Sequence, residues 1–373
     1  MKTPFGKHAS GLRLERMQGS SRYRDGEFRN VHPVSPGLRG GNMPSIGDFI
    51  CSSGRRVPAA PLATFDPRPS WGKPPETGLR VTWLGHSTLL VELDGVRVLT
   101  DPVWGERVSP VGFAGPRRFH PVPVKLSQLP PLDAVIVSHD HYDHLDYPTI
   151  LELAKSEVPF ITSLGVGAHL ESWGIAEARI TELDWWESAP IAGGRAQVSA
   201  APSQHFSGRA PGMRNTTAWS SFALRGPRHG FFFSGDTGLT DEYASIREKL
   251  GPFDLVALEV GAFHPAWGDI HLGPENALKA WQLLGGAHFL PVHWGTFNLA
   301  MHDWDEPAEV LLERGRDVPL LMPRLGEAVE PARAAAPSPW WRTPGTALEG
   351  AAPPEPEAPS ELDPAAPLAF PLD

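Results

Sequence analysis

The sequence predicts an α/β protein in which two β-sheets pack face to face and helices cover their outer faces, a four-layer αββα sandwich. Two β-rich runs flank Asp94-Gly95, a dipeptide typical of hairpin turns. Further along the chain, strand and helix signals alternate, and this order favours two sheets with helices outside them. The 373 residues are 41% hydrophobic and 20% charged, a composition that supports a substantial core.

The elements expected to form these layers follow one another along the chain. After the hairpin, buried strands are expected at Ala134 to Val137 and in PFITSL. Later strands are expected at Ala196 to Ala201, Ala218 to Leu224, His229 to Ser234 and Leu255 to Val260. Helices are expected at Tyr147 to Lys155, Val166 to Trp173, Glu242 to Leu250, Pro274 to Leu284 and Pro307 to Arg314. Both prolines suit the first helical turn, where no N–H donor is needed.

The two ends of the chain differ from its middle in composition. Residues 1–77 are rich in Gly, Pro, Arg and Ser, and we expect an irregular N-terminal extension. Residues 330–373 are rich in Pro and Ala and carry too little apolar surface to order themselves, so a disordered tail is expected. One domain is therefore expected at 78–329. Trp340 and Trp341 interrupt the tail; they are a docking or membrane-contact point or, the favoured interpretation, rings packed back on the domain.

Charge and cysteine content narrow the class of protein. The net charge of -10 argues against a dedicated nucleic-acid binder, which usually presents a basic surface. Cys51 is the single cysteine, so no disulfide can form within the chain, which fits a reducing cytoplasm. We find no apolar signal segment and no window of 18 apolar residues. A cytoplasmic location is expected, with peripheral contact at the inner membrane face and a homodimer left open.

The segment SHDHYDH carries a dense set of side chains that bind metals: His139, His141, Asp143 and His144. It follows an apolar strand directly, so we expect it at a strand end, where loops carry function. Alternate positions of an extended chain point the same way and a turn then redirects the last two side chains, which suits two adjacent metals better than one. Imidazole and carboxylate favour zinc or a similar divalent ion.

Three further candidates lie just after expected strands. They are His205 in APSQHFSGR, Asp236 in FFFSGDTG and His293 in FLPVHWGTF. A single histidine is more often a core or surface residue than a metal ligand, so each is weak support alone. Their common placement at strand ends favours one shared site.

The pattern HxHxDH, followed by a distant His, a distant Asp and a final His, resembles the metallo-β-lactamase superfamily. More narrowly, TWLGHSTLLVELDG, LTDPVW, GPRRFHPVP, SHDHYDHLD, SGDTG and PVHWGTF resemble the branch of N-acylphosphatidylethanolamine-hydrolysing phospholipase D and its bacterial relatives. The resemblance covers about Leu79 to Phe297, with a short further match at Tyr23 to Asn30. It implies the αββα fold, but the fold hosts many chemistries and says less about the substrate.

The resemblance also implies a role for each matching residue. One of two zinc ions would be held by His139, His141 and His205. The second would be held by Asp143, His144 and His293, with Asp236 bridging both. A bridging hydroxide would be the nucleophile, since zinc lowers the pKa of water from about 15.7 to about 7. Iron or manganese can occupy comparable sites. Asp143, Asp236 and His271 are the expected catalytic residues.

Several other residues carry two interpretations each. His271 in GDIHLGPENA matches a histidine that the resembled branch places near the substrate, with decoration of the following helix as an equal alternative. Asp101 in LTDP is expected to orient a ligating imidazole. His86 in LGHST could do the same, although a satisfied core histidine is favoured.

Three further residues stay open. Arg117 and Arg118 in GPRRF could contact a substrate phosphate, but an exposed loop pair is slightly favoured. Tyr142 either faces the pocket or has a packing role.

The expected function is that of a metal-dependent phosphodiesterase of phospholipase D type. The resemblance implies N-acylphosphatidylethanolamine-like lipids as substrates, attacked by the metal-bridging hydroxide. A lactonase or other small-ester hydrolase of the same fold is the alternative, and a nuclease is weaker because the chain lacks an evident basic, aromatic-rich stretch. The partner is thus a small molecule or lipid, and no nucleic acid.

Overall fold

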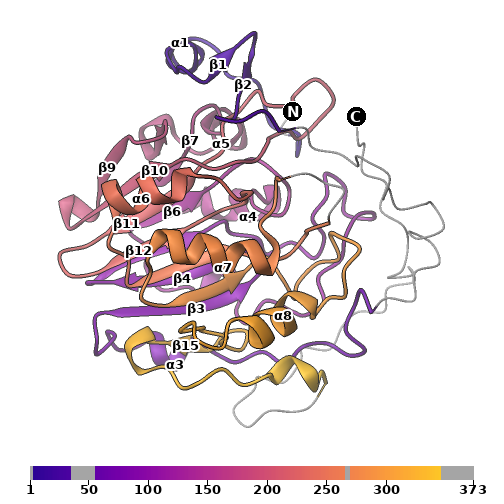
Figure 1. Cartoon of the computed structure of the whole chain (residues 1–373). Coiled ribbons are helices and arrows are strands. Elements are labelled where there is room, and N and C mark those ends of the chain that lie inside the picture. The colour runs from indigo at the N-terminus through magenta and orange to yellow at the C-terminus, as the bar shows by residue number, and fades with distance from the viewer. Residues whose placement is uncertain (1–2, 35–54, 265–268, 346–373) are drawn as a thin grey trace.

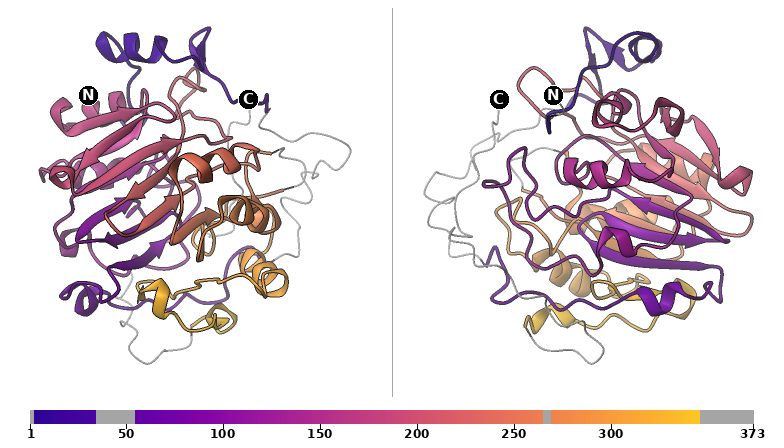
Figure 2. Two further views of the ribbon diagram at one scale, coloured as in Figure 1. Left: turned by 60° about the vertical axis from the view of Figure 1, so that its left-hand side comes forward. Right: turned by 180° about the vertical axis from the view of Figure 1, so that it is seen from behind.

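Two mixed β-sheets pack face to face in the computed structural model, which describes residues 3–34, 55–264 and 269–345 (Figure 1). The seven-stranded sheet has the order β15-β3-β4-β5-β6-β7-β8 and the six-stranded sheet the order β14-β13-β12-β11-β10-β9. Helices lie outside the sheets, with the orange helices of the second half on the side away from the purple strands (Figure 2). The predicted αββα sandwich is confirmed.

The strand bounds follow the expected order along the chain. The first sheet contains β3 (Leu79–Gly85), β4 (Thr88–Leu93), β5 (Val96–Thr100), β6 (Ala134–Val137), β7 (Phe160–Ser163), β8 (Ile180–Leu183) and β15 (Ala328–Val329). The second contains β9 (Ser188–Ile191), β10 (Ala196–Ala201), β11 (Ser221–Arg225), β12 (Gly230–Phe233), β13 (Leu255–Glu259) and β14 (Phe289–Val292). Asp94 and Gly95 form the turn between β4 and β5, as the hairpin signal predicts.

The helices that cover the sheets match the expected segments except α3, which lies in the N-terminal extension that was expected to be irregular. They are α3 (Arg68–Trp71), α4 (Tyr147–Leu153), α5 (Gly167–Trp173), α6 (Glu242–Leu250), α7 (Gly273–Leu284) and α8 (Glu306–Arg314). The N-cap of α4 is Asp146, whose side chain accepts a hydrogen bond from the Thr149 N–H.

The strand expected from Ala218 begins three residues later, at Ser221. The backbone N–H groups of Ala218 and Ser220 donate to the carbonyls of Leu164 (2.7 Å) and Ser138 (3.2 Å). These residues therefore bind loops that follow β6 and β7 instead of extending the β11 ladder.

Alternate residues of the first sheet fill two separate cores. In β6, Ala134 and Ile136 join the core between the sheets, whereas Val135 and Val137 join the core beneath α4 and α5. Successive side chains of a strand point to opposite faces, so a sheet covered on both sides requires a continuous apolar run. This explains why LDAVIV carries no polar alternation.

Parallel strands bring the polar strand ends to one edge. Strands β5 to β8 are parallel, and so are β12 to β14. Loops at the carboxyl ends of parallel strands lie side by side, which is where α/β proteins place their ligands. The segments that follow β5, β6, β12, β13 and β14 carry all but one of the predicted site residues.

The N-terminal extension contains regular elements. Helix α1 (Leu12–Gln18) and the hairpin of β1 (Tyr23–Arg24) and β2 (Glu27–Phe28) form the indigo unit at one end of the sandwich (Figure 1). Phe28 and Met17 are buried with Trp219 of the main domain. Cys51 lies outside the described residues.

The described part of the predicted tail is ordered. Residues 331–345 follow β15, and Trp340 and Trp341 are buried there. Their rings contact that of Trp294, at centroid distances of 6.1 and 5.4 Å. Packing on the domain, the favoured interpretation of this pair, is confirmed, and the expectation of disorder is wrong for 331–345. The composition of this segment understated the apolar surface that it can bury, because two indoles bury more of it than the neighbouring alanines and prolines do. Residues 346–373 lie outside the description.

Among the described residues, no helix combines the length and apolar character that crossing a bilayer requires.

Candidate metal centre

The loop after β6 brings its ligand-type side chains to the edge of the first sheet. The backbone turns at once, since the N–H groups of His144 and Leu145 both donate to the His141 carbonyl, at 3.1 and 2.8 Å. This turn directs His139 and His141 to one side and Asp143 and His144 to the other. The Nε2 of His139 lies 2.8 Å from the Nδ1 of His141.

The three distant candidates converge on this loop. The Nε2 of His205 lies 3.2 Å from the Nδ1 of His141 and 3.7 Å from the Oδ2 of Asp236. A first group, whose ligand atoms all lie within 4.8 Å of one another, therefore consists of His139, His141, His205 and Asp236.

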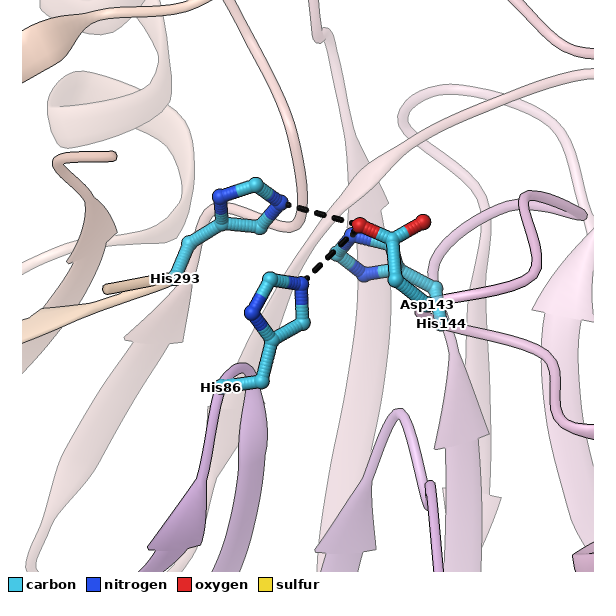
Figure 3. A group of neighbouring side chains, drawn as sticks. All are labelled: His86, Asp143, His144 and His293. Atoms are coloured by element: carbon cyan, nitrogen blue, oxygen red, sulfur yellow. Dashed lines mark hydrogen bonds and ion pairs between the residues drawn. The ribbon is translucent and has the colours of Figure 1, made fainter. Parts of the chain in front are cut away.

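A second group surrounds Asp143 (Figure 3). The Nε2 of His293 lies 3.3 Å from the Oδ2 of Asp143 and 3.2 Å from the Oδ2 of Asp236. The Nε2 of His144 lies 3.2 Å from the Oδ1 of Asp236. Asp236 thus faces both groups, which is the arrangement that a bridging carboxylate requires. The structure brings all seven predicted ligands together; their binding of metal stays a prediction.

His86 belongs to the second group, a position that sequence reasoning did not favour. It lies in the turn between β3 and β4 and is buried, and its Nε2 is 3.0 Å from the Oδ2 of Asp143 (Figure 3). His86 is a buried histidine with a partner, as the favoured interpretation expected, but that partner is a predicted ligand, so the geometry supports the alternative that His86 orients the site. The available signal was its place at a strand end, the same signal that identified His293.

Buried hydrogen bonds orient the imidazoles. Asp101 accepts from the Nδ1 of His144 at 2.7 Å and from the N–H and Oγ of Ser138 at 2.7 and 2.6 Å. This confirms the expected contact of Asp101 with a site imidazole. The Nδ1 of His205 lies 2.9 Å from the Ile270 carbonyl. Each contact places a proton on Nδ1 and turns Nε2 toward the centre, the nitrogen that would bind a metal.

The centre shows opposed pKa shifts. Burial lowers the pKa of His139 and His205 well below the usual value. Burial acts the same way on His144 and His293, but the Asp236 and Asp143 carboxylates together with their hydrogen bonds outweigh it, so the pKa of His144 is raised well above its usual value and that of His293 to about 10. The protein without metal therefore holds protons on two imidazoles to balance its carboxylates.

These residues fit divalent cations. Among the described residues, the buried atoms that form no well-aligned hydrogen bond include the Nε2 of His144, the Nε2 of His293 and the Oδ1 of Asp236, whose contacts with one another are those of charged neighbours. Buried polar atoms without partners cost free energy, and here they face one another across two His/Asp groups. A cation in each group would satisfy them and replace the two protons.

His271 lies at the rim of the centre. Its Nδ1 is 3.2 Å from the Oε1 of Glu259, which also accepts from the Leu272 N–H at 2.7 Å, and 4.0 Å from the Oδ2 of Asp236. Glu259 ends β13 and is fully buried. A carboxylate only accepts, so the His271 proton lies on Nδ1 and its Nε2 remains for another partner. Sequence reasoning missed Glu259, because its strand reads as apolar until its last residue.

Asp140 and Arg209 fix the loop from behind and were also missed. The Asp140 carboxylate accepts from the Gly208 N–H at 2.8 Å and the Thr217 hydroxyl at 2.9 Å, and lies 3.3 Å from the Nε2 of His169. The Nη1 of Arg209 donates to the carbonyls of Asp140 and Leu145, at 2.5 and 2.8 Å. The ligand-bearing turn is therefore held at both ends by buried groups.

Strained backbone accompanies the site. His86, Asp101 and His293 have φ values of 51°, 34° and 64°, in the left-handed region that side chains with a Cβ rarely adopt. Such conformations persist where the surroundings enforce them, and they concentrate at functional sites. Gly235, before Asp236, has φ 56°, and a Cβ there would lie 2.6 Å from that of Ser138. SGDTG therefore needs its first glycine.

The three residues that the sequence left open, Arg117, Arg118 and Tyr142, make packing contacts. Arg118 is partly buried, donates to the Val103 carbonyl at 2.6 Å and lies over the Phe297 ring. The expectation of an exposed pair is wrong, because both arginines are partly buried where the loop folds back on the domain. Arg117 donates to Glu106 at 2.5 Å. The Tyr142 hydroxyl donates at 2.5 Å to the carbonyl of Arg209, which lies in the segment between β10 and β11, so Tyr142 has a packing role between two segments.

The fold and this centre define the class of protein, and comparison with known families agrees. A profile of the β-lactamase superfamily domain matches residues 96–294, more than half of the chain. The chain belongs to the metallo-β-lactamase superfamily and is a metal-dependent hydrolase of that fold.

Within that class, particular relatives are much closer. An uncharacterized protein of Mycobacterium tuberculosis is 44% identical over 346 residues, which cover 91% of each chain. N-acyl-phosphatidylethanolamine-hydrolyzing phospholipase D 1 of Caenorhabditis elegans is 39% identical over 249 residues, covering 64% of this chain and 70% of the worm protein. The resemblance to the phospholipase D branch is thereby confirmed.

Solved structures agree on the fold. Isothiocyanate hydrolase from Delia radicum gut bacteria superposes with a TM-score of 0.55 at 22% identity, covering 67% of this chain and 98% of that one.

Proposed function

We propose that the protein is a phosphodiesterase that hydrolyses N-acylphosphatidylethanolamine-like lipids to N-acylethanolamine and phosphatidic acid. The observation that carries the proposal is the convergence of two His/Asp groups on Asp236, in a chain whose relatives include a phospholipase D of that specificity. Two nearby cations are the usual means of clamping a phosphodiester.

The chain's own residues account for binding and orientation. Cations held by the two groups would lower the pKa of a water molecule from about 15.7 to about 7 and so supply a nucleophile at neutral pH. Asp236 lies between the two groups and contacts both. His86 and His293 contact Asp143, and Asp101 orients His144. Water adds to phosphorus and the bond to the N-acylethanolamine oxygen breaks. That oxygen then needs a proton.

His271 is the residue placed to serve the leaving oxygen. Glu259 holds its Nδ1, which fixes the ring and leaves Nε2 as the free nitrogen. The side chain is partly exposed at the rim, whereas His139, His205 and His293 behind it are buried. A proton carried on Nε2 would pass to the oxygen that departs from phosphorus.

An exposed apolar loop supports a lipid substrate. The loop after β5 carries Val111 and Phe113 at its tip, 36% and 73% exposed. Its base packs on Phe297 and Tyr142, so the tip lies on the same edge of the sandwich as the metal centre. Arg107 and Arg117 flank it and form an isolated β-bridge with each other. Apolar tips with basic flanks suit insertion among anionic headgroups.

The activity test uses the zinc-loaded protein with N-acylphosphatidylethanolamine in mixed micelles. We expect N-acylethanolamine and phosphatidic acid in equal amounts by mass spectrometry, and no product after chelation and dialysis. A lactone panel run in parallel is the alternative readout. Cleavage of lactones without any release of N-acylethanolamine would contradict the proposal and favour a small-ester hydrolase.

We expect Phe113→Asp to reduce turnover of substrate in anionic vesicles about tenfold, because burial of one aromatic side chain contributes about 1.5–3 kcal/mol. Turnover of a short-chain substrate below its micelle concentration should stay within about twofold, because no bilayer is involved. The matched control is Leu283→Asp, since Leu283 is 40% exposed on the outer helix α7. Equal losses in both variants, or no loss on vesicles, would refute a lipid-contact role for the loop.

A further inference from the structure

His205 occupies a stretch of chain without a β-ladder to hold it. Strand β10 ends at Ala201 and β11 begins at Ser221, and His205 lies between them in irregular backbone. Its ring must nevertheless face His141 and Asp236 at 3.2 and 3.7 Å. Ile270 fixes the ring through Nδ1, but the backbone of His205 requires a partner of its own.

Asn30 supplies that partner with one side chain. Its Nδ2 donates to the His205 carbonyl at 2.8 Å, and its Oδ1 accepts from the His205 N–H at 3.1 Å. The same Oδ1 accepts from the Nε1 of Trp219 at 3.0 Å. A primary amide offers both a donor and an acceptor with two lone pairs, so it can pair with both backbone groups of one residue as a neighbouring strand would.

The N-terminal unit, formed by α1, β1 and β2, holds Asn30 in place through contacts that do not involve the metal centre. The Phe28 N–H donates to the Asn215 carbonyl at 2.7 Å, and the Phe28 ring is fully buried beside Trp219. Arg22 forms an ion pair with Asp184 at 2.7 Å. The hairpin therefore presents Asn30 to His205 from a docked, rigid element.

We infer that Asn30 is a positioning residue of the metal centre, which fixes the backbone of His205 so that its imidazole meets the first group. The N-terminal unit is then part of the metal-binding apparatus and not an appendage. This inference rests on the ligand role of His205 and is independent of the substrate, so a failed lipid assay would leave it standing.

The test compares Asn30→Asp and Asn30→Ala with Asn276→Asp. Asparagine to aspartate keeps the shape and both accepted hydrogen bonds but removes the donor to the His205 carbonyl. Asn276 is a partly exposed residue of α7 that accepts from Lys279, so it controls for the chemistry of the change. Zinc affinity is measured by competition with a chromophoric chelator, and Co²⁺ absorption reports the coordination geometry. Melting temperature is recorded with and without zinc.

We expect both Asn30 variants to bind zinc about 10–100-fold more weakly, the usual effect of losing a group that orients a ligand. The Co²⁺ spectrum should change, and the rise in melting temperature on adding zinc should shrink relative to the wild type and to Asn276→Asp. Zinc affinity within about twofold of the wild type in the Asn30 variants would overturn the inference, even if their metal-free form melts earlier. An equal loss in Asn276→Asp would overturn it as well.

Discussion

Replacing Asp236 by alanine is expected to lower kcat/KM by on the order of 10³-fold or more, because one carboxylate serves both groups of ligands. Its oxygens lie 3.2 Å from the Nε2 atoms of His144 and His293 and 3.7 Å from that of His205. Metal content, measured by elemental analysis, should fall with activity. The fold should persist, since the neighbouring imidazoles can release their protons and leave no buried charge stranded.

Asp241→Ala is the matched control for this experiment. Asp241 is exposed, precedes α6, and its side chain forms no capping hydrogen bond. Steady-state kinetics and circular dichroism should give wild-type values for this variant. Wild-type turnover in Asp236→Ala, at wild-type metal content, would show that the convergence of the two groups on this carboxylate has no catalytic meaning.

Asp140→Ala is expected to destabilise the protein by about 3–5 kcal/mol, the usual cost of removing one partner from a buried charged network. The change leaves the Gly208 N–H and the Thr217 hydroxyl without their acceptor and removes a buried countercharge from Arg209. Urea unfolding measures the loss, with Asp241→Ala expected within about 0.5 kcal/mol of the wild type. A loss below about 1 kcal/mol in Asp140→Ala would contradict this account.

The same carboxylate predicts a pH dependence. Burial alone would raise the pKa of Asp140, but the hydrogen bond from His169 and nearby cationic groups lower it to about 2. The folded pKa lies below the unfolded one, so the anion stabilises the fold above about pH 4, and this contribution, about 2 kcal/mol, is lost as the pH falls toward 2. Asp140→Asn should lack that part of the acid dependence. If the free energies of unfolding of the wild type and of Asp140→Asn fell in parallel between pH 4 and pH 2, the proposed contribution of the Asp140 anion would be disproved.

The fold was predictable because its strands carry a strong local signal. A sheet buried on both faces demands continuous apolar runs such as LDAVIV and GFFF, and these runs end abruptly where polar site residues begin. The seven predicted ligands were found for the same reason, since each follows such a run or lies within the HxHxDH motif.

The supporting residues could not be predicted, because their roles depend on contacts between distant segments. Asn30 lies 175 residues from His205, and nothing local distinguishes it from a turn asparagine. Glu259, at the end of β13, and Asp140, just after β6, look like ordinary polar residues until His271 and Gly208 are placed beside them. His86 was underestimated although it follows a strand as His293 does, because a single histidine at such a position is more often a core residue than a site residue.

The indole cluster of Trp83, Trp294, Trp340 and Trp341 sets a boundary for protein engineering. Trp294 directly follows His293, and its stacked partner Trp83, at 5.3 Å, donates to the His86 carbonyl. Shortening the chain before residue 340 would strip the outer wall from this cluster and loosen the two turns that carry His86 and His293. Tags, fusion partners and cleavage sites should therefore be placed beyond residue 345, although composition alone would suggest truncating the chain at residue 330. The same indoles give the native enzyme a built-in fluorescent reporter beside its ligand histidines.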